Sequence, residues 1–402
     1  MSDLSKKRIL ILGAGRGQMG LYKGARELGI TTIGATLLDK VPYCMHLADE
    51  ICEANIMNPD EVEEKSRNID FDGVATCCLD KGLKALGRLC DRRNLIGYSE
   101  ESAELCNDKL RMKQRFNDYG VSTAPFELIK TRDDIDKIIE SLGCYPVIVK
   151  ATDLAGSRGI YIARNREEAT LGFDCAMEET SKDYLIIEKF IEGKEFGAQA
   201  FIQNGKILFI LPHGDILYSA NTNVPIGHYV PYTVDSKLND KISKTASLAI
   251  GSMGLDNCAV NLDFIEKDGE VYVLELSGRI GANGLPEVVS GYYNIDYYKM
   301  VLLASLGVDV EPMWNSRHVV GAVMSRMIFS EHKSGVLKQV RHDSTDDEAI
   351  IGLQIFLKEG DNVHKFENSS HCVGQLTVKA PTVQDCKIIS DEFINNIDLD
   401  LM

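Results

Sequence analysis

The sequence lacks any apolar run that approaches the roughly 18 residues needed for a membrane-spanning helix. Its first residues, "MSDLSKK", pass directly into the apolar segment "RILIL", which leaves no room for a signal peptide. We therefore expect a cytoplasmic protein with no membrane partner.

Paired cysteines are also lacking. The 11 cysteines lie between Cys44 and Cys386, their number is odd, and no two of them have C-x-x-C spacing. Neither a zinc knuckle nor a disulfide framework is indicated, and the pattern is typical of reduced thiols in a cytosolic protein.

Positive charge is scarce. The 44 lysines and arginines are outnumbered by 60 aspartates and glutamates, which gives a formal net charge of −16. Binding to a phosphate backbone needs a clustered positive surface, so we expect no nucleic acid partner. A small anion such as a nucleotide is still compatible with this charge, because a few lysines and backbone amides can dominate locally in a cleft.

What the sequence does contain is ample core material. With 402 residues, of which 44% are hydrophobic and 26% charged, two or three domains are expected. Short apolar runs alternate with helical patterns from Arg8 to about Gly97, which predicts a parallel sheet in a Rossmann-like domain. The pattern then becomes β-rich. The predicted fold class is multidomain, α/β and α+β, with domains at 1–105, 106–312 and 313–402, the last small and β-rich.

A glycine-rich turn, "GAGRGQMG", follows the first predicted strand. The frame that follows the strand directly has Gln18 where a dinucleotide-binding turn needs its third glycine, and the frame that matches starts two residues late, at Gly15. Asp39 could imitate the ribose-binding acid. Three interpretations stay open: NAD binding, a turn that needs glycine for backbone reasons, and a helix N-terminus that faces an anionic part of another substrate.

A lysine and a small loop suggest phosphate binding in "YPVIVKATDLAGSRGIYIA". Lys150 ends an apolar strand, and the loop Gly156–Gly159 joins it to a second strand instead of opening a helix, so this is not a Walker A loop. Backbone N–H groups and Arg158 can fold over a triphosphate that Lys150 also contacts. A basic turn without a ligand is the alternative.

Two acids lie on the arms of a predicted hairpin in "NLDFIEKDGEVYVLELSGRIGANG". Asp263 and Glu275 suit Mg²⁺, which prefers oxygen ligands, and Arg279 could stabilise charge on a transferring phosphoryl or acyl-phosphate oxygen. A regular two-residue turn at Asp268–Gly269 would place the acids on opposite faces of the sheet. Shared metal binding therefore predicts a bulge or an odd-length loop; a purely structural hairpin is the alternative.

The order of these pieces, together with "NDKLRMK", "IIEKFIEGKEFG" and the C-terminal "SGVL", "EGDNV" and "VGQLTVKAPTVQDC", resembles the ATP-grasp superfamily of carboxylate–amine ligases over nearly the whole chain. The last segment is similar to the closing domain of biotin-carboxylase-like and L-amino-acid-ligase-like members. The resemblance implies ATP with Mg²⁺, or Mn²⁺ in its place, and small-molecule carboxylate and amine substrates. It leaves open whether the chain forms a homodimer.

The resemblance also implies roles for individual residues. The positions that match ATP-binding residues are Lys109 and Lys150 for the phosphates, Gly156, Ser157, Arg158 and Gly159 for the loop over them, Glu188, Lys189 and Ile191 for the hinge that pairs with adenine through its main chain, and Glu195 for the ribose. The positions that match metal ligands are Asp263, Glu275 and Ser277, and Arg279 and Lys150 match catalytic residues. Ser277 stands where the family usually has asparagine, a stronger metal ligand.

The expected reaction is phosphorylation of a carboxylate by ATP, attack of an amine on the acyl phosphate, and release of ADP and phosphate. Our first expectation is an enzyme that joins an amino acid to an amine, and the alternative is a ligase of the phosphoribosylglycinamide synthetase type. An NAD-dependent oxidoreductase and a nucleotide-binding regulatory protein without turnover are rivals from other classes. None of the eight histidines has metal-ligand spacing; His213 and His228 are predicted to be ordinary core or surface residues, or to line the second substrate's pocket.

Overall fold

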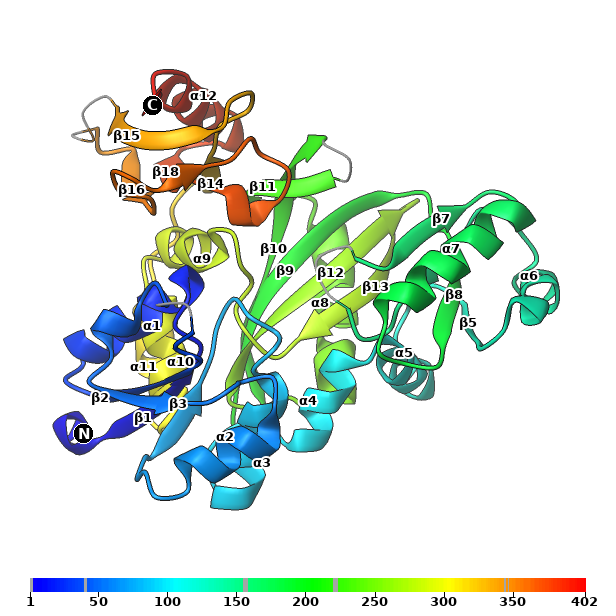
Figure 1. Cartoon of the computed structure of the whole chain (residues 1–402), viewed down its shortest axis with the longest axis horizontal. Helices are drawn as coiled ribbons and strands as arrows, with labels where there is room; N and C mark the ends of the chain where they lie inside the picture. The colour runs from blue at the N-terminus through cyan, green and yellow to red at the C-terminus, as the bar shows by residue number, and fades with distance from the viewer. Residues whose placement is uncertain (1–2, 40–41, 155–157, 220–222, 343–344, 346) are drawn as a thin grey trace.

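A computed structural model of the chain describes residues 3–39, 42–154, 158–219, 223–342, 345 and 347–402. The N-terminal part is a parallel sheet with the strand order β3-β2-β1-β4 and helices packed around it (Figure 1). Its elements are β1 (Arg8–Leu12), α1 (Met19–Glu27), β2 (Thr31–Thr36), β3 (Glu50–Glu53), α2 (Pro59–Ser66), β4 (Gly73–Ala75), α3 (Leu83–Arg93) and α4 (Glu100–Asn107). The predicted α/β front domain is confirmed.

The next part is a four-stranded antiparallel sheet with the order β5-β8-β6-β7. Its elements are α5 (Lys109–Asp118), β5 (Phe126–Ile129), α6 (Ile135–Leu142), β6 (Val147–Lys150), β7 (Ile160–Ala163), α7 (Arg166–Glu179) and β8 (Leu185–Lys189). Helix α5 begins at Asp108, whose carboxylate accepts hydrogen bonds from the first backbone N–H groups, and it ends before Gly120, which has a φ of +68°. These two residues fix the bounds of α5.

An eight-stranded sheet, ordered β13-β12-β9-β10-β11-β14-β18-β16, forms the centre of the molecule (Figure 1). Its strands are β9 (Lys194–Gln203), β10 (Lys206–Ser219), β11 (Asn223–Val230), β12 (Cys258–Lys267), β13 (Glu270–Ser277), β14 (Ala322–Ile328), β16 (Ile350–Ile355) and β18 (Gly374–Ala380). Hairpins β9/β10 and β12/β13 turn at Asn204–Gly205 and Asp268–Gly269, where all four residues have positive φ, as two-residue hairpin turns require.

The remaining helices and strands lie around the central sheet and in the C-terminal part of the chain (Figure 1). They are α8 (Ser236–Ser252), α9 (Leu285–Tyr293), α10 (Tyr297–Ser305), α11 (Glu311–Asn315), β15 (Gly335–Arg341), β17 (Asn362–Val363), α12 (Val383–Asn395) and β19 (Asp398–Leu401). Strands on both sides of residue 312 share the eight-stranded sheet, and the domain boundaries near 105 and 312 stay a prediction. In the described ranges, no helix combines the length and the apolar character needed to cross a membrane.

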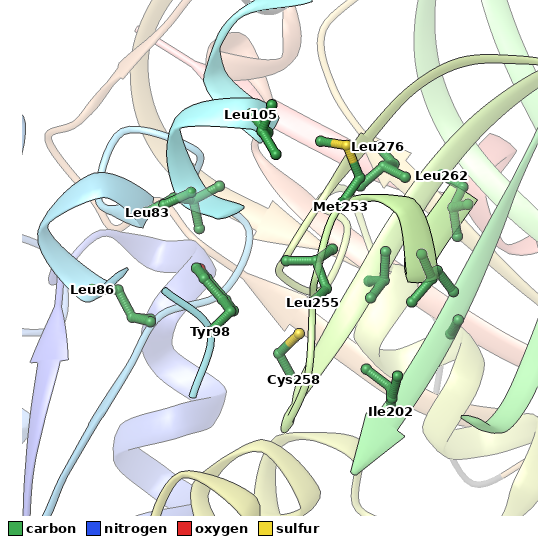
Figure 2. Packing of buried hydrophobic residues seen from close by; sticks show 14 of the residues in the cluster. Leu83, Leu86, Tyr98, Leu105, Ile202, Met253, Leu255, Cys258, Leu262 and Leu276 are labelled. Atoms are coloured by element: carbon green, nitrogen blue, oxygen red, sulfur yellow. The ribbon is translucent and has the colours of Figure 1, made fainter. Parts of the chain in front are cut away.

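One hydrophobic cluster joins the front sheet to the central sheet. Leu83, Leu86 and Tyr98 from the front part meet Leu255 and Cys258, which lead into β12 (Figure 2). Since these side chains are nearly or fully buried, the front part is held firmly beside the hairpin that carries the two acids.

The hydroxyl of Tyr98 is expected to lower the free energy of unfolding. It is buried and has no hydrogen-bond partner among the described residues, and an unpaired buried hydroxyl costs about 1–3 kcal/mol. Tyr98→Phe should leave the free energy of unfolding unchanged or raise it by about 1 kcal/mol. Tyr98→Ala should lower it by about 3–5 kcal/mol, because it opens a cavity in the cluster. Thermal unfolding of both variants measures this difference, and equal losses would contradict it.

Candidate active site

The two acids of the β12/β13 hairpin face the same side of the sheet. Asp263 lies directly opposite Glu275, while the next pair is Phe264 with Val273, so Leu274 is an extra residue in β13. A bulge of this kind shifts the register by one and returns Glu275 to the face that Asp263 occupies. The predicted bulge is confirmed.

The surroundings of Asp263 raise the pKa of its carboxyl group. Burial, with further contributions from the Glu275 and Asp215 carboxylates, raises the pKa of Asp263 to about 8. Two carboxylates this close repel each other, and a divalent cation would remove the repulsion. The donor set fits Mg²⁺, which prefers carboxylate oxygens, and metal binding by Asp263 and Glu275 stays a prediction.

Lys109 lies at the start of α5 and contacts the acid pair. Its Nζ is 3.0 Å from Oε2 of Glu275 and donates a hydrogen bond of 2.7 Å to the carbonyl of Leu154. Burial by itself lowers the pKa of Lys109, but the Glu275 carboxylate outweighs it and the net shift is upward. A lysine predicted to bind phosphate is therefore held in its charged form beside the predicted metal ligands.

A second buried charge group surrounds Glu188, the last-but-one residue of β8. Its carboxylate lies 2.9 Å from Nζ of Lys150 and 3.3 Å from Nζ of Lys113. Burial by itself raises the pKa of Glu188, but the attraction of the two ammonium groups outweighs it and lowers the pKa. Sequence reasoning used only the main chain of Glu188 and missed Lys113. The four-residue spacing of Lys109 and Lys113 on α5 was a usable signal, because such residues share a helix face.

The main chain after Glu188 is fixed by neighbouring strands. The N–H of Lys189 donates to the carbonyl of Pro125 at 2.9 Å, and the N–H of Phe190 donates to the carbonyl of Pro146 at 3.2 Å. Ile191 follows this fixed segment. Adenine pairing by Glu188, Lys189 and Ile191 stays a prediction.

Of the further residues predicted to contact the nucleotide, the structure describes Glu195, Arg158 and Gly159. Glu195 is exposed near the start of β9, and its ribose-binding role stays a prediction. Gly156 and Ser157 lie outside the described residues. Arg158 is exposed, and the carbonyl of Gly159 accepts a hydrogen bond of 2.8 Å from the N–H of Ala151, which closes the base of the loop.

Arg279 is held by a residue from the front domain that sequence reasoning missed. Asp80 receives two hydrogen bonds of 2.8 Å from Nε and Nη2 of Arg279, and the hydroxyl of Ser277 donates to it at 2.6 Å. Burial works against both charges, but the pair lowers the pKa of Asp80 and raises that of Arg279. Asp80 follows β4, at the carboxyl end of a parallel strand where α/β folds commonly place binding residues; that position was the available signal.

Ser277 was predicted as a metal ligand. Its hydroxyl proton is directed to Asp80, so the side chain helps to orient the carboxylate that holds Arg279. Its metal role stays a prediction.

The glycine-rich front turn is occupied by the protein's own groups. Oε1 of Gln18 accepts the N–H of Gly15 at 3.0 Å, and its Nε2 donates to the carbonyl of Cys77 at 2.6 Å. Arg16 donates to the carbonyls of Ser369 and Cys372 in the C-terminal segment. Gln18 thus fills the position of the third glycine, which a dinucleotide-binding turn needs for close packing of its helix against the strand, and its side chain is hydrogen-bonded within the turn, which disfavours the NAD interpretation.

Two cavities are lined by residues that lie near one another in the sequence. A small one of about 50 Å³ is lined by Asp80, Lys109, Asp263, Glu275 and Arg279, among others. A large one of about 970 Å³ lies between the front turn, the start of α9 and the C-terminal part of the central sheet. Cys78 and Ala282 line the large cavity, and they are close in sequence to Asp80 and Arg279, which line the small one.

The large cavity contains charged and polar side chains. Glu287 on α9 accepts hydrogen bonds from the hydroxyl of Tyr298 at 2.8 Å and from Nε2 of Gln375 at 3.2 Å, and Lys23 on α1 lies in the same lining. A small site with cations and paired acids beside a roomy polar cavity is the arrangement of an ATP-dependent ligase that brings two substrates together.

Comparisons with known proteins agree with this class. The family model described as phosphoribosylglycinamide synthetase, ATP-grasp (A) domain, matches residues 107–223. The crystal structure of phosphoribosylglycinamide synthetase from Anaerococcus prevotii is 47% identical, with a TM-score of 0.88, and the match covers 98% of this chain and 100% of that one.

Two further structures share the fold. L-amino acid ligase from Bacillus licheniformis has a TM-score of 0.83 at 18% identity, covering 99% of both chains. The biotin carboxylase domain of the Hydrogenobacter thermophilus 2-oxoglutarate carboxylase, in complex with MgADP, ADP and bicarbonate, has a TM-score of 0.80 at 19% identity, covering 98% of this chain and 91% of that one.

The chain belongs to the ATP-grasp family, in the group that contains the Anaerococcus prevotii protein. It is an ATP-dependent carboxylate–amine ligase that forms carbon–nitrogen bonds, and ATP and Mg²⁺ are the cofactors of this family.

Removing the charge of Asp80 should impair catalysis more than folding. Asp80→Asn leaves Arg279 without its carboxylate, and we expect ADP formation to fall by about 100-fold or more, as when a preorganised donor is lost. The free energy of unfolding should fall by only about 1–3 kcal/mol, because the pair is partly exposed. Asp60→Asn is the control: Asp60 pairs with Arg88 at the surface, so the loss should stay below about 1 kcal/mol. Equal turnover in Asp80→Asn and Asp60→Asn would contradict the role of Asp80.

The raised pKa of Asp263 predicts a pH dependence of stability. A carboxyl whose pKa rises from 3.8 to about 8 on folding binds more protons in the folded state between these values. The free energy of unfolding of the metal-free protein should therefore fall as the pH rises from about 5 to 8. Asp263→Asn should flatten this slope, which thermal unfolding at several pH values measures. A slope that is identical in the variant would show that Asp263 titrates normally.

Proposed function

We propose that this chain phosphorylates the carboxylate of an α-amino acid with ATP and transfers the acyl group to an amine, with release of ADP and phosphate. The observation that carries the proposal is the small cavity in which Lys109, the acid pair and the Asp80-held Arg279 lie together beside the large polar cavity. Positioning and charge neutralisation are the main contributions a protein makes to phosphoryl transfer.

ATP would lie between the antiparallel sheet and the central sheet. Lys109 and Lys150 would contact its phosphates, the segment after Glu188 its adenine, and Glu195 its ribose. Asp263 and Glu275 would hold Mg²⁺, which neutralises phosphate charge when bound. Arg279 would stabilise the acyl phosphate.

The amino acid assignment is supported by Glu287 in the large cavity. Its carboxylate is oriented by Tyr298 and Gln375 and is available to bind the ammonium group of a substrate. A partly buried carboxylate that lines a polar cavity selects a cationic group by charge complementarity. The amine acceptor in this first candidate is a second amino acid or a similar small amine.

A second candidate is supported by the 47% identity to phosphoribosylglycinamide synthetase. The product in that name is the amide of glycine with a phosphoribosyl amine, so an amino acid is again the acyl donor. Lys23 in the large cavity would supply a cation for the phosphate, whereas Arg16 is already bound to two carbonyl groups.

A substrate panel separates the two candidates. ADP release is measured with each amino acid alone, with pairs of amino acids, and with each amino acid plus phosphoribosylamine. Dipeptide formation supports the first candidate. Turnover of glycine only with phosphoribosylamine supports the second, and no ADP release with any amino acid contradicts both.

Lys150 should be essential for the phosphoryl transfer. Lys150→Met removes a close cation in a partly dehydrated cleft, a loss of about 2–4 kcal/mol of transition-state stabilisation. The rate should fall by roughly 30-fold to 1,000-fold. Lys130→Met, which changes an exposed lysine paired with Asp183, is the matched control and should keep full activity. The assay detects ADP with phosphate separately from AMP with pyrophosphate; pyrophosphate as the product would contradict the acyl-phosphate mechanism.

A further inference from the structure

A buried His–Asp–His cluster lies on the central sheet, outside the residues assigned above. His213 and Asp215 are on β10 and His228 is on β11. The two histidines are 2% and 5% exposed. Nδ1 of His213 lies 3.2 Å, and Nδ1 of His228 lies 2.7 Å, from the same oxygen, Oδ1 of Asp215.

This geometry assigns the tautomer of both rings. An ionised carboxylate only accepts hydrogen bonds, so each histidine donates its Nδ1–H to Asp215 and each Nε2 carries a lone pair. Both Nε2 atoms are buried and have no hydrogen-bond partner among the described residues. Buried polar atoms are normally paired, so two unpaired acceptors in one cluster indicate a group that the protein receives from outside.

The register of the sheet connects His213 to the acid pair. Glu275, Asp263, Gly197 and His213 are successive cross-strand partners on β13, β12, β9 and β10. Directly opposed residues project to the same face of a sheet. A Cβ on Gly197 would lie 2.5 Å from Nε2 of His213, so the imidazole extends over this glycine toward Asp263.

The other side of the cluster is next to Ser325, which adjoins the lining of the large cavity. Asp215, His228 and Ser325 are also successive cross-strand partners, on β10, β11 and β14. A Cβ on Gly284 would lie 2.6 Å from the Ser325 side chain, and Gly284 lines the large cavity. The cluster therefore lies between Ser325, which adjoins the lining of the large cavity, and the acids expected to hold Mg²⁺.

We propose that Nε2 of His213 is the general base that deprotonates the attacking amine, and that Asp215 and His228 are positioning residues that hold His213 in the required tautomer. This inference rests on the proposed function. An amine that enters as an ammonium ion has no lone pair for attack until a proton is removed.

One ammonium proton passes to Nε2 of His213, and the freed lone pair forms the C–N bond at the acyl phosphate carbon. The bond between the acyl carbon and the oxygen that links it to phosphorus breaks. Phosphate leaves with the electron pair of that bond and takes the second amine proton. The imidazolium that forms is stabilised by the Asp215 carboxylate beside Nδ1.

The charges around His213 are consistent with a base. Burial lowers the pKa of His213 more than Asp215 raises it, while His228 on β11 lowers it further. Hydrogen bonds from both histidines hold the pKa of Asp215 below its usual range, although burial opposes this. Asp263 on β12 and Glu275 on β13 are the acids on the side toward which the ring extends.

A metal bound by Nδ1 and Oδ1 fits the distances less well. The 2.7 Å contact of His228 with Asp215 is a hydrogen-bond length, and two ligands of a tetrahedral zinc ion are about 3.3 Å apart. A bound metal ion is therefore one of the results that would overturn the proposal.

The test separates acyl phosphate formation from proton removal. Amide formation is measured with the amine substrate, and hydroxamate formation with hydroxylamine, which is uncharged near neutral pH and needs no base. His213→Gln should lower amide formation by about 100-fold or more and leave hydroxamate formation close to wild type. The low-pH limb of the amide-forming rate should disappear in the variant. His332→Gln, at an exposed position, is the control.

Asp215→Asn provides a second variant with nearly unchanged volume. It should show the same split between the two nucleophiles, because an amide no longer fixes the tautomer of His213. Equal loss with both nucleophiles, unchanged amide formation, or a stoichiometric metal that is present in the wild type and absent from His213→Gln would overturn the proposal. Wild-type protein that forms no hydroxamate from any amino acid would overturn the proposed function instead, and this inference with it.

Discussion

One extra residue in a β-hairpin, Leu274, determines on which face of the central sheet the two acids of the candidate site lie. Without the bulge, the two-residue turn at Asp268–Gly269 would send the carboxylates of Asp263 and Glu275 to opposite faces of the sheet. With it, both acids lie on the face that also carries His213. The site therefore depends on a register shift in the backbone as much as on the identity of the acids.

Buried and partly buried charges lie in the rest of the candidate site, and three pairings join opposite charges there. Lys109 contacts Glu275, Lys150 and Lys113 share Glu188, and Arg279 is held by Asp80. An isolated charge is strongly destabilised when it is buried, and the carboxylate partners raise the pKa of Lys109 and of Arg279 where phosphate is expected. The same pairs fix the side chains in position before a substrate arrives, which lowers the entropic cost of binding.

The front domain contributes to the site through two kinds of contact. The hydrophobic cluster around Tyr98 sets its position against the central sheet (Figure 2), and Asp80 extends from it to Arg279. Its glycine-rich turn has a different task from dinucleotide binding: Gln18 covers the turn, and Arg16 joins it to the C-terminal segment. The turn thereby becomes one wall of the large cavity, between the first and last parts of the chain.

The sequence by itself determined the elements whose signals are local. Alternating apolar and helical patterns predicted the front sheet, and the Asp-Gly pair marked the turn of the hairpin that carries the two acids, because each depends on the preferences of neighbouring residues. Motif order predicted the family and the ATP-dependent chemistry.

Only the tertiary structure decided which distant residues meet. Asp80 and Arg279 are 199 residues apart in the sequence. Lys113 on α5 and Lys150 on β6 both contact the carboxylate of Glu188 on β8. His213 and His228 share one carboxylate only because β10 and β11 pair in one particular register. Such contacts arise when the sheets pack and the loops close, and no pattern within a short window of sequence specifies them.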